Sequence, residues 1–466
     1  MTQKLVTRSL TARYLAADVG RRPLVSERAD PAHVQNVGLA LEERLLTRPA
    51  FLEAAEVTRL ETDLNTVVDL LFSLPDRLFG GDLYAFGAAV GLRSDQVRLA
   101  LRTPVPEPAR IGRADLYRDD TGFRLLEFNL SSALGGLQIP ELNRLLLADN
   151  GLARFAHAEE LTFPDTVAVL AEVITTTARN AGHFAAPCRV ALMDCVSGYR
   201  ATEPEIRVLA QLLAPLGVEA VPCHMGQVRE AGGRVFVDGR PIDVVYRFFT
   251  LGELTADAAS RAAAEELLDA LARCDVPVLS PLCTSMHGNK RALAMLWEDK
   301  CQEVLAPSEK DLVQRLLPWT RELCQGTARI QQETVDLLDH CRRHRERLVL
   351  KPAHGLGGTG TVLGRSVTEA EWVSHLDRAL QRPHIVQELV TPQPELFLTT
   401  DPTDPSGAAE PAPWVLNWGA FLLGRRYAGA FLRGLPVERA DVISYAERAY
   451  AGCVFQGHTG RTLPEQ

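Results

Sequence analysis

Apolar residues along the first hundred positions recur every three or four residues. Residues 51–74 and 83–101 show this spacing, which is typical of helices that bury one face. Three prolines between positions 104 and 108 then break the pattern. We therefore predict a helical N-terminal region over residues 1–105.

The pattern next changes to one with strand character. Residues 110–117 and 122–129 favour strands, and Asp-Asp-Thr-Gly at 119–122 is typical of a hairpin turn. We predict this β-hairpin, followed by helices, over residues 106–185. Because alternate residues of a strand share a face, polar residues two apart should project together.

Between residues 186 and 282 short apolar strands alternate with helices. Strand-like runs cover 189–194, 218–223 and 242–248, and a helix is expected over 203–216. This alternation predicts a parallel α/β domain, which we expect to bind the substrate.

Residues 283–435 are predicted to form nucleotide-binding subdomains with a glycine-rich lid, and residues 436–466 a C-terminal tail. In order, the pattern predicts helices at 289–298 and 333–347, strands at 348–352 and 361–363, a helix at 369–381, a strand at 384–390, a loop at 401–413 and a hairpin over 414–432. The expected fold class is α+β or α/β.

Composition excludes several classes of protein. The 466 residues are 46% hydrophobic and 23% charged, with a net charge of −9 and a pI of about 5.7. We therefore expect no nucleic acid and no membrane as partner, and no run of about eighteen apolar residues suggests a membrane span. The first residues lack an apolar signal segment, and the nine cysteines show no paired spacing, so we expect a cytoplasmic protein. Monomer and homodimer both stay open.

Lysine is rare in this chain: only five of the 50 basic residues are lysines. A lysine within a motif therefore points to chemistry that needs a compact ammonium, such as a point contact with phosphate. Lys290 and Lys351 are the two in motifs. Lys290 lies at the predicted start of a helix, where a cation is unfavourable unless an anion is near. The alternative for Lys290 is a surface lysine.

Lys351 precedes a glycine-rich segment that ends at Gly360. Its G-x-G-x-x-G pattern is found in dinucleotide-binding proteins, but there the glycines open a helix, and here the next residues favour a strand. No GxxxxGK[ST] segment is present, so the chain is not a P-loop protein. A strand, a lysine and a glycine loop could fold over a triphosphate and donate N–H groups to it. The alternative is an ordinary glycine-rich hairpin.

Polar residues of the predicted hairpin form a second candidate group: Arg113, Asp115, Glu127 and Asn129. Two carboxylates and an amide oxygen suit Mg²⁺, and an arginine beside them could neutralise a transferred phosphoryl group. The alternative is a solvated, charged hairpin, although an unpaired charge in so apolar a stretch is costly. Ser131 and Ser132 follow in a turn that can approach a ligand closely.

Further candidates lie in the α/β region. Arg247 ends a predicted strand and could clamp a substrate carboxylate with two parallel hydrogen bonds. Arg200 and Glu205 lie where a strand gives way to a helix, the usual place for ligands in such sheets. Surface ion pairing explains Glu205 at least as well.

Two more candidates lie near the C-terminal end. Gln387 and Glu388 stand on a predicted strand whose backbone could read an adenine edge, although most such strands are simply core. Arg433, after the last predicted hairpin, is a candidate for contacting phosphate or carboxylate.

The order of these motifs resembles that of the circularly permuted ATP-grasp ligases, in particular the glutathionylspermidine synthase-like group. In ordinary ATP-grasp enzymes the two lysines come before the metal-binding Glu-x-Asn, whereas here Glu127-Phe-Asn129 precedes Lys290 and Lys351. The spacing of R-x-D and E-x-N is also similar to that group's motif. The resemblance covers residues 105–435, and the first hundred residues carry no matching motif.

The resemblance implies roles for the candidate residues. Arg113 would stabilise the phosphoryl charge, and Mg²⁺ would be held by Asp115, Glu127 and Asn129. Arg433, which does not come from the resemblance, is a second catalytic candidate. Lys290 and Lys351 would contact the phosphates of ATP. The lid would consist of Gly355, Gly357, Gly358, Thr359 and Gly360, and the adenine hinge of Gln387 and Glu388.

We therefore expect an ATP- and Mg²⁺-dependent carboxylate–amine ligase that acts on small amino-acid-like molecules through an acyl phosphate. A γ-glutamyl or dipeptide ligase would fit. The alternatives are a phosphotransferase that uses the same ATP site and a non-catalytic nucleotide-binding protein.

Overall fold

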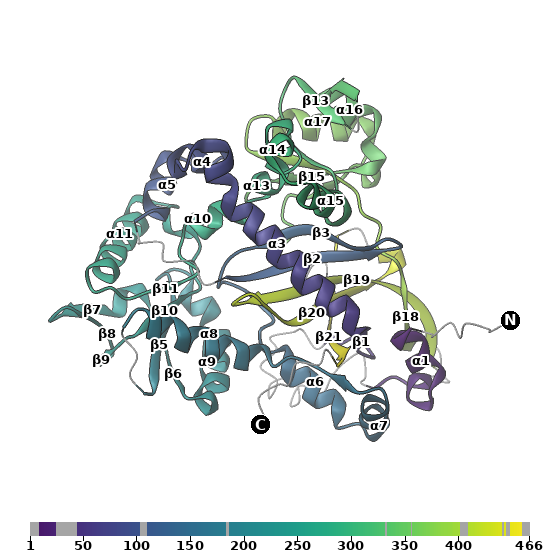
Figure 1. Cartoon of the computed structure of the whole chain (residues 1–466), viewed down its shortest axis with the longest axis horizontal. Helices are drawn as coiled ribbons and strands as arrows, with labels where there is room; N and C mark the ends of the chain where they lie inside the picture. Colours follow the sequence, from purple (N-terminus) through teal and green to yellow (C-terminus); the bar gives the residue numbers. More distant parts are fainter. Residues whose placement is uncertain are drawn as a thin grey trace.

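The computed structural model describes residues 9–24, 44–102, 110–182, 186–330, 333–355, 357–400, 409–439, 442–443 and 448–458. Within these ranges the chain forms a large sheet, a parallel sheet and a smaller antiparallel sheet, each packed against helices (Figure 1). The mixed α and β architecture agrees with the predicted fold class. None of the helices in these ranges is long and apolar enough to cross a membrane.

The large sheet joins strands from both ends of the chain. Its order is β1-β21-β20-β19-β2-β3, with β18 beside the first part of β19 and β4 beside β21. The pair β1–β21 is parallel, and the other pairs are antiparallel. The strands are β1 Ala50–Leu52, β2 Ile111–Asp119, β3 Gly122–Asn129, β4 Leu161–Thr162, β18 Glu395–Thr400, β19 Ala409–Leu423, β20 Arg426–Pro436 and β21 Tyr450–Gly457.

A 26-residue helix, α3 (Ala54–Phe79), crosses one face of this sheet (Figure 1). It begins with a reciprocal capping box between Glu53 and Glu56, which satisfies two backbone N–H groups. It ends at Gly80, whose φ of 61° lies in the left-handed region that favours glycine. The helix start and stop therefore follow from local sequence.

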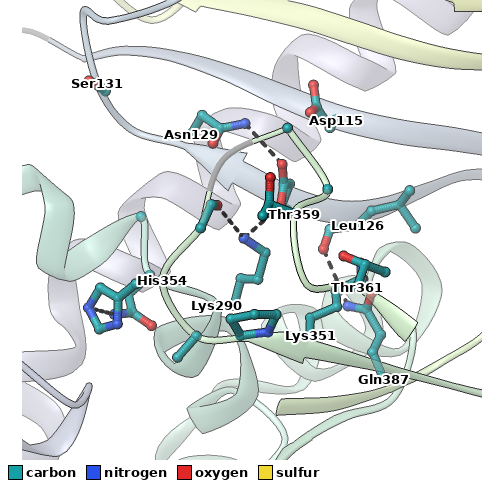
Figure 2. A pocket seen from close by; sticks show the side chains of 18 of the residues that line it. Asp115, Leu126, Asn129, Ser131, Lys290, Lys351, His354, Thr359, Thr361 and Gln387 are labelled. Atoms are coloured by element: carbon teal, nitrogen blue, oxygen red, sulfur yellow. Dashed lines mark hydrogen bonds and ion pairs between the residues drawn. The ribbon is translucent and has the colours of Figure 1, made fainter. Parts of the chain in front are cut away.

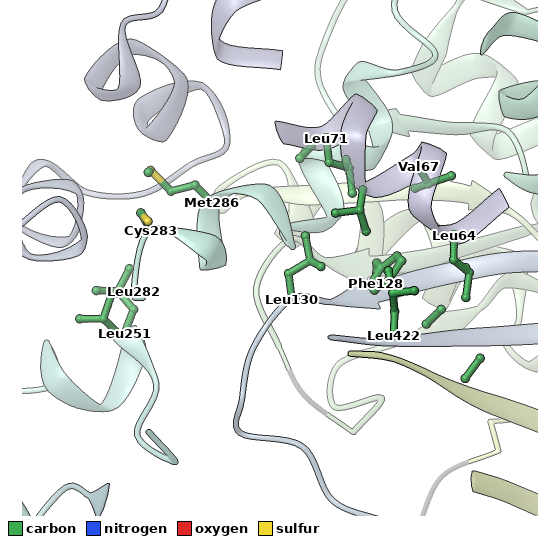
Figure 3. Packing of buried hydrophobic residues seen from close by; sticks show 14 of the residues in the cluster. Leu64, Val67, Leu71, Phe128, Leu130, Leu251, Leu282, Cys283, Met286 and Leu422 are labelled. Carbon is green, nitrogen blue, oxygen red and sulfur yellow. The ribbon is translucent and has the colours of Figure 1, made fainter. Parts of the chain in front are cut away.

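The apolar side of α3 packs onto the sheet. Figure 3 shows Leu64, Val67 and Leu71 of the helix beside Phe128 and Leu422 of the sheet. All five side chains are fully or almost fully buried. This layer holds the hairpin β2–β3 from the side opposite its polar residues.

Helices α6 (Ile139–Leu147) and α8 (Thr166–Asn180) belong to the core on the other face. Along β19, Ala420 and Leu422 belong to the core beneath α3, whereas Phe421 and Leu423 belong to the core of α6 and α8. Burial on both faces explains why this stretch is a continuous apolar run instead of an alternating one.

The parallel sheet has the order β11-β10-β5-β6, and all its pairs are parallel. The prediction of a parallel sheet in this region is confirmed. Its elements, with the adjoining ribbon β7–β9, are β5 Cys188–Asp194, α9 Tyr199–Leu213, β6 Val218–His224, β7 Val228–Ala231, β8 Arg234–Val237, β9 Arg240–Pro241, β10 Val244–Arg247, α10 Leu251–Leu254, α11 Ala258–Arg273 and β11 Val278–Leu279.

The smaller antiparallel sheet has the order β12-β17-β15-β16 and its own core, which includes Leu350, Trp372 and Val386. Its strands are β12 Thr320–Glu322, β15 Leu348–Pro352, β16 Val362–Leu363 and β17 His384–Glu388, beside the ribbon β13 Thr327–Ile330 and β14 Glu333–Asp336. The helices of this region are α12 Thr284–His287, α13 Lys290–Met295, α14 Asp299–Val304, α15 Pro307–Leu316, α16 Leu337–Arg343 and α17 Glu369–Ala379. The remaining helices are α1 Leu10–Ala16, α4 Leu83–Ala89, α5 Ser94–Ala100 and α7 Asn150–Ala158.

One predicted helix begins later than expected. Residues 333–336 of the predicted helix 333–347 form strand β14, paired with β13. The helix α16 starts only at Leu337, because the Asp336 side chain accepts a hydrogen bond from the Asp339 N–H and caps it. Thr334 and Val335 are β-branched residues, which suit a strand.

Both ends of the described chain also differ from the prediction. The N-terminal region contains β1 as well as helices, and the predicted tail contains β21, a strand inside the large sheet. Residues 409–413 of the predicted loop 401–413 begin β19, and residues 401–408 lie outside the described residues. These strands are stabilised by partners far away in sequence, which local patterns do not reveal.

We expect Leu71→Ala in α3 to lower the free energy of unfolding by about 2–5 kcal/mol, since Leu71 is 0% exposed and its truncation leaves a cavity. Urea unfolding followed by circular dichroism measures the change. Tyr84→Ala is the control, because Tyr84 is 57% exposed and such surface changes stay within about 0.5 kcal/mol. Equal stability of the Leu71 variant and the native protein would contradict the packing of α3.

Candidate active site

A cavity of about 980 Å³ lies where the three sheets meet. Its walls come from the hairpin β2–β3, the loop that follows it, the segment before α13, the strands β15 and β17 with the glycine loop, and the carboxyl end of β10. Figure 2 shows its central part, with Lys290 and Lys351 between Asn129 and Gln387. A cavity of this size can hold a nucleotide-sized ligand.

The hairpin β2–β3 places its four polar candidates on one face. Arg113 lies opposite Asn129 and Asp115 opposite Glu127 in the strand register. Ala114 and Phe128, between them, point into the core beneath α3. A register shift follows Asp115, and all four polar residues line the cavity. The predicted hairpin and its shared polar face are therefore present.

Asp115 is held between two arginines. Its carboxylate oxygens lie 3.0 Å from Arg113 Nε and 2.9 Å from Arg433 Nη2, and only 4% of the residue is exposed. Burial alone would raise the pKa of Asp115, but the two guanidinium groups together lower it. Asp115 therefore stays ionised and fixes both arginines.

Arg113 has room to reach this position because Gly419 lies beneath it. A Cβ atom at Gly419 would lie 2.9 Å from Arg113 Cδ, which is closer than real side chains pack. Arg113 also donates a hydrogen bond from Nη1 to the Gly135 carbonyl at 2.9 Å. The guanidinium group of Arg433 donates a hydrogen bond to Asn417 Oδ1 at 2.8 Å.

Lys290 forms an ion pair with Glu127, with 2.8 Å between Nζ and Oε2. It also donates a hydrogen bond to the Gly355 carbonyl at 3.1 Å. Asn129 Nδ2 approaches Glu127 Oε1 at 3.4 Å (Figure 2). The anion that a lysine at the start of α13 requires is therefore, in this structure, the carboxylate of Glu127.

Lys351 lies on β15 and donates a hydrogen bond to Gln387 Oε1 at 2.7 Å. Gln387 in turn donates to Thr320 Oγ1 at 3.0 Å. Burial lowers the pKa of Lys351 to about 8, with a further decrease from Lys290, while Glu127 acts in the opposite direction. A partly buried ammonium with a neutral hydrogen-bond partner is stabilised by any anion that enters the cavity.

The glycine loop connects β15 to β16, as predicted. Gly357, Gly358 and Gly360 have φ values of 65°, 80° and 76°, a left-handed conformation that suits glycine. A Cβ atom at Gly360 would lie 2.9 Å from Pro352 Cγ. The residues of this loop that line the cavity include Gly355, Gly357, Gly358 and Thr359.

The two predicted serines, Ser131 and Ser132, differ in whether they face the cavity. Ser131 lines the cavity, but Ser132 is fully buried and donates hydrogen bonds to the carbonyls of Arg247 and Leu279 at 2.8 and 3.1 Å. Ser132 therefore fixes the loop after β3 to the parallel sheet instead of facing a ligand. This arrangement corrects the expectation that both serines contact substrate.

Arg200, Glu205 and Glu388 differ in their exposure and in their position relative to the cavity. Arg200 is exposed near the start of α9, after β5, and is not part of the cavity wall, so its assignment to the substrate stays a prediction. Glu205 lies below the wall near Gly135, and its pKa is raised by burial, with Arg113 opposing. Glu388 is exposed at the cavity rim, with Arg124 at 3.9 Å.

Several residues of the wall were missed by sequence reasoning. His354 Nε2 accepts a hydrogen bond from Asn289 Nδ2 at 2.7 Å, and burial, with the neighbouring Lys290 and Arg291, lowers its pKa to about 4. The histidine stands within the glycine-loop motif, and that position was the available signal. Arg93 and Gln96 of the α4–α5 segment also line the cavity, and no motif marks them.

The cavity is positively charged within an acidic protein. Eight lysine or arginine side chains and three carboxylates line it among the described residues, whereas the whole chain has a net charge of −9. The basic residues are Arg93, Arg113, Arg247, Lys290, Lys351, Arg365, Arg382 and Arg433. Such a concentration of cations attracts an anionic ligand.

Comparisons with known proteins identify the fold. No family model matches the chain. Uncharacterized proteins of Mycobacterium bovis and Mycobacterium tuberculosis are 29% identical over 394 residues, or 80% of this chain and 66% of theirs. The chain thus spans about two thirds of the length of these relatives.

Among solved structures, the apo form of a glutathione synthetase-like effector from Globodera pallida aligns with a TM-score of 0.52 and 10% identity, over 88% of this chain and 89% of that one. This protein therefore has a fold of the glutathione synthetase-like class. A putative gamma-glutamylcysteine synthetase from Methylobacillus flagellatus aligns with a TM-score of 0.42 and 14% identity, over 86% and 88% of the two chains, an overlap too loose to add weight.

We expect the stability of the protein to depend on pH through Lys351. An unfolded chain keeps this proton up to a pKa near 10.5, whereas the folded protein loses it from about 8. The unfolded state therefore binds more protons between these values, and the free energy of unfolding rises with pH there by at most about 1.4 kcal/mol per unit. Urea unfolding of the native protein and Lys351→Met from pH 7 to 10 measures this term. The same pH slope in both proteins would contradict it.

Proposed function

We propose that this protein is an ATP-dependent carboxylate–amine ligase. It would form an amide bond between small amino-acid-like molecules and release ADP and phosphate. The observation that supports this function is that Lys290, Lys351 and the glycine loop share one cavity wall with Glu127 and Asn129. The glutathione synthetase-like fold supports the same class of reaction, and γ-glutamyl or dipeptide ligation fits it.

The nucleotide would lie between the glycine loop and β17. Lys290 and Lys351 would bind its phosphates, since both residues line the cavity together with the glycine loop, whose backbone N–H groups would add further donors. Gln387 and Glu388 would form the hinge near the adenine. An arriving triphosphate would compensate the cost of burying Lys351, whose nearest hydrogen-bond partner is neutral.

Glu127 and Asn129 are the residues that best fit Mg²⁺. They are alternate residues on one strand face, and their side-chain oxygens are of the type that Mg²⁺ prefers. Both oxygens of Asp115 already lie beside arginines, so we assign it to holding Arg113 and Arg433 instead of to the predicted metal site. When bound there, Mg²⁺ would neutralise part of the phosphate charge.

Arg113 and Arg433 would stabilise the charge that develops on the transferred phosphoryl group. A substrate carboxylate near Arg113 would attack the γ-phosphate and give an acyl phosphate, and an amine would then displace phosphate. No nucleophilic side chain is required, because positioning and fixed positive charge lower both barriers. The closer relationship to permuted ATP-grasp ligases is part of this proposal, since the Glu-x-Asn strand precedes both lysines in the chain.

The products test the proposed reaction. We expect ADP and phosphate only when ATP and Mg²⁺ are incubated with both a carboxylate and an amine, because the acyl phosphate needs both partners to turn over. Incubation with pooled amino acids and polyamines, followed by mass spectrometry, detects the condensed product. Transfer of phosphate to a substrate without condensation would identify a phosphotransferase instead.

Loss of either charged group at the nucleotide should abolish turnover without unfolding the protein. We expect Lys351→Ala and Glu127→Ala each to reduce ADP formation on the order of 10²–10³-fold or more, as for other fixed charges at reacting phosphates or oxyanions. Circular dichroism checks the fold. Lys300→Ala and Glu303→Ala, exposed residues outside the cavity wall, are the matched controls. Native turnover in either site variant would refute the assignment.

A further inference from the structure

Arg247 is a buried cation without a carboxylate partner. It ends β10, only 2% of it is exposed, and it lines the cavity from the side of the parallel sheet. No carboxylate of the described residues lies within ion-pair distance of its guanidinium group; its hydrogen-bond partners are carbonyls and a hydroxyl. Burial lowers the pKa of Arg247 to about 10, and the groups that oppose this decrease are Cys283 and Tyr246, neither of them a carboxylate.

The surrounding backbone holds this guanidinium group in place. Its Nε donates to the Ser280 carbonyl, Nη1 to the Phe249 carbonyl at 2.9 Å, and Nη2 to Thr284 Oγ1 at 3.4 Å. Ser280 has a φ of 56°, an unusual value for a residue other than glycine. Because a guanidinium group carries five N–H groups, these three contacts leave two for a ligand.

A charge buried in this way is costly unless an anion compensates it. The carboxyl ends of parallel strands are also where ligands bind in open α/β sheets. Arg247 lies at such an end, and the Ser132 hydroxyl joins its carbonyl to the loop that carries Ser131. The cation is therefore beside the same loop that follows the Glu127–Asn129 strand.

No carboxylate lines this end of the cavity among the described residues. The three acidic residues of the wall, Asp115, Glu127 and Glu388, stand on the hairpin and on β17. Around Arg247 the wall consists of neutral and cationic groups, including Ser131, Thr250, Ser285, Arg93 and Gln96.

Carboxylates of the neighbouring elements outside the wall have other partners. Asp194, which ends β5, accepts hydrogen bonds from the Cys195 N–H and the Thr202 hydroxyl at 2.7 and 2.5 Å. Asp95 pairs with Arg93 and Arg261 at 3.1 and 2.9 Å. Glu253 accepts hydrogen bonds from the N–H and hydroxyl of Thr250 and caps α10. Glu205 has a raised pKa because it is buried. This end of the cavity thus suits an anion and repels a polyamine.

We infer that Arg247 binds a second carboxylate of the substrate, distinct from the one that reacts with ATP. The substrate class is then a dicarboxylate or an acidic amino acid or peptide, and a polyamine is excluded from this end. The inference rests on the proposed function in one respect, namely that the bound carboxylate belongs to a ligase substrate. The anion site itself exists whether or not turnover occurs. The remaining N–H of Nη1 and that of Nη2 would make the contact.

Glutarate is the probe for this site, with glutaramide as its neutral analogue and spermidine as the cationic competitor. Thermal shift titrations would be made in the presence of Mg²⁺ and a non-hydrolysable ATP analogue, which covers the phosphate-binding lysines. We expect glutarate to stabilise the native protein and glutaramide and spermidine to have no effect. Stabilisation by spermidine equal to that by glutarate would overturn the inference without any variant.

The same titration on variants shows whether glutarate binding depends on Arg247 itself or only on the overall positive charge of the cavity. We expect Arg247→Gln to weaken glutarate binding roughly 10- to 100-fold, the loss typical of a hydrogen bond to a charged group, and Arg247→Lys to retain part of it. Arg48→Gln is the control, since Arg48 is also buried and donates to carbonyls, in addition to its ion pair with Glu395, but lies outside the cavity wall. Unchanged glutarate affinity in a folded Arg247→Gln protein would disprove the site.

Failure of the two proposals can be told apart. If the ATP analogue does not bind but glutarate still distinguishes Arg247→Gln from the native protein, the ligase proposal fails and the anion site stands. If the analogue binds and glutarate has the same affinity for Arg247→Gln as for the native protein, the anion site fails and the ligase proposal stands.

Discussion

The pairing of β2 with β19 is the contact on which the site depends. It joins the hairpin, from the first third of the chain, to the long C-terminal strands, and it places Asp115 opposite Gly419. Gly419 leaves space for Arg113, and the neighbouring strand β20 brings Arg433 to the same carboxylate. A buried carboxylate between two arginines is stable only when all three are in register, because the loss of any one leaves an uncompensated charge. The α3 layer beneath the hairpin enforces that register from the other face.

Charge is distributed along the cavity in a defined order. Lys290 is paired with Glu127, and Arg113 and Arg433 share the single carboxylate of Asp115, whereas Lys351 and Arg247 have neutral hydrogen-bond partners. The two cations with neutral partners lie on different sheets, at β15 and β10. Two separate anions would therefore gain most from this arrangement, in agreement with the proposed triphosphate at β15 and the proposed carboxylate at β10.

Local patterns were sufficient for much of the fold and for half of the site. The hairpin turn at 119–122, the parallel strands and the glycine loop each have a signature within a few residues, and all three are present. The polar alternation at 113–115 and 127–129 also predicted the shared face. By contrast, β1 and β21 need each other as partners, and β14 needs β13, so their local sequences misled the prediction. Ser132 was misjudged for the same reason, because its acceptors come from β10 and β11.

The α4–α5 segment shows why a region without motifs still belongs to the site. The Val90 carbonyl accepts a hydrogen bond from Asn289, beside Lys290, and Gly91 lies so close to Pro383 that a Cβ atom would be 2.8 Å from its ring. Gln96 donates a hydrogen bond to Thr255, next to the helix α10 that follows Arg247. The segment therefore connects the sheet that carries Lys351 to the sheet that carries Arg247. Under the proposed function Lys351 contacts the nucleotide and Arg247 the other substrate, so the spacing between the two sheets decides how far apart the two ligands lie. The α4–α5 segment, which also contributes Arg93 and Gln96 to the cavity wall, links these two sheets.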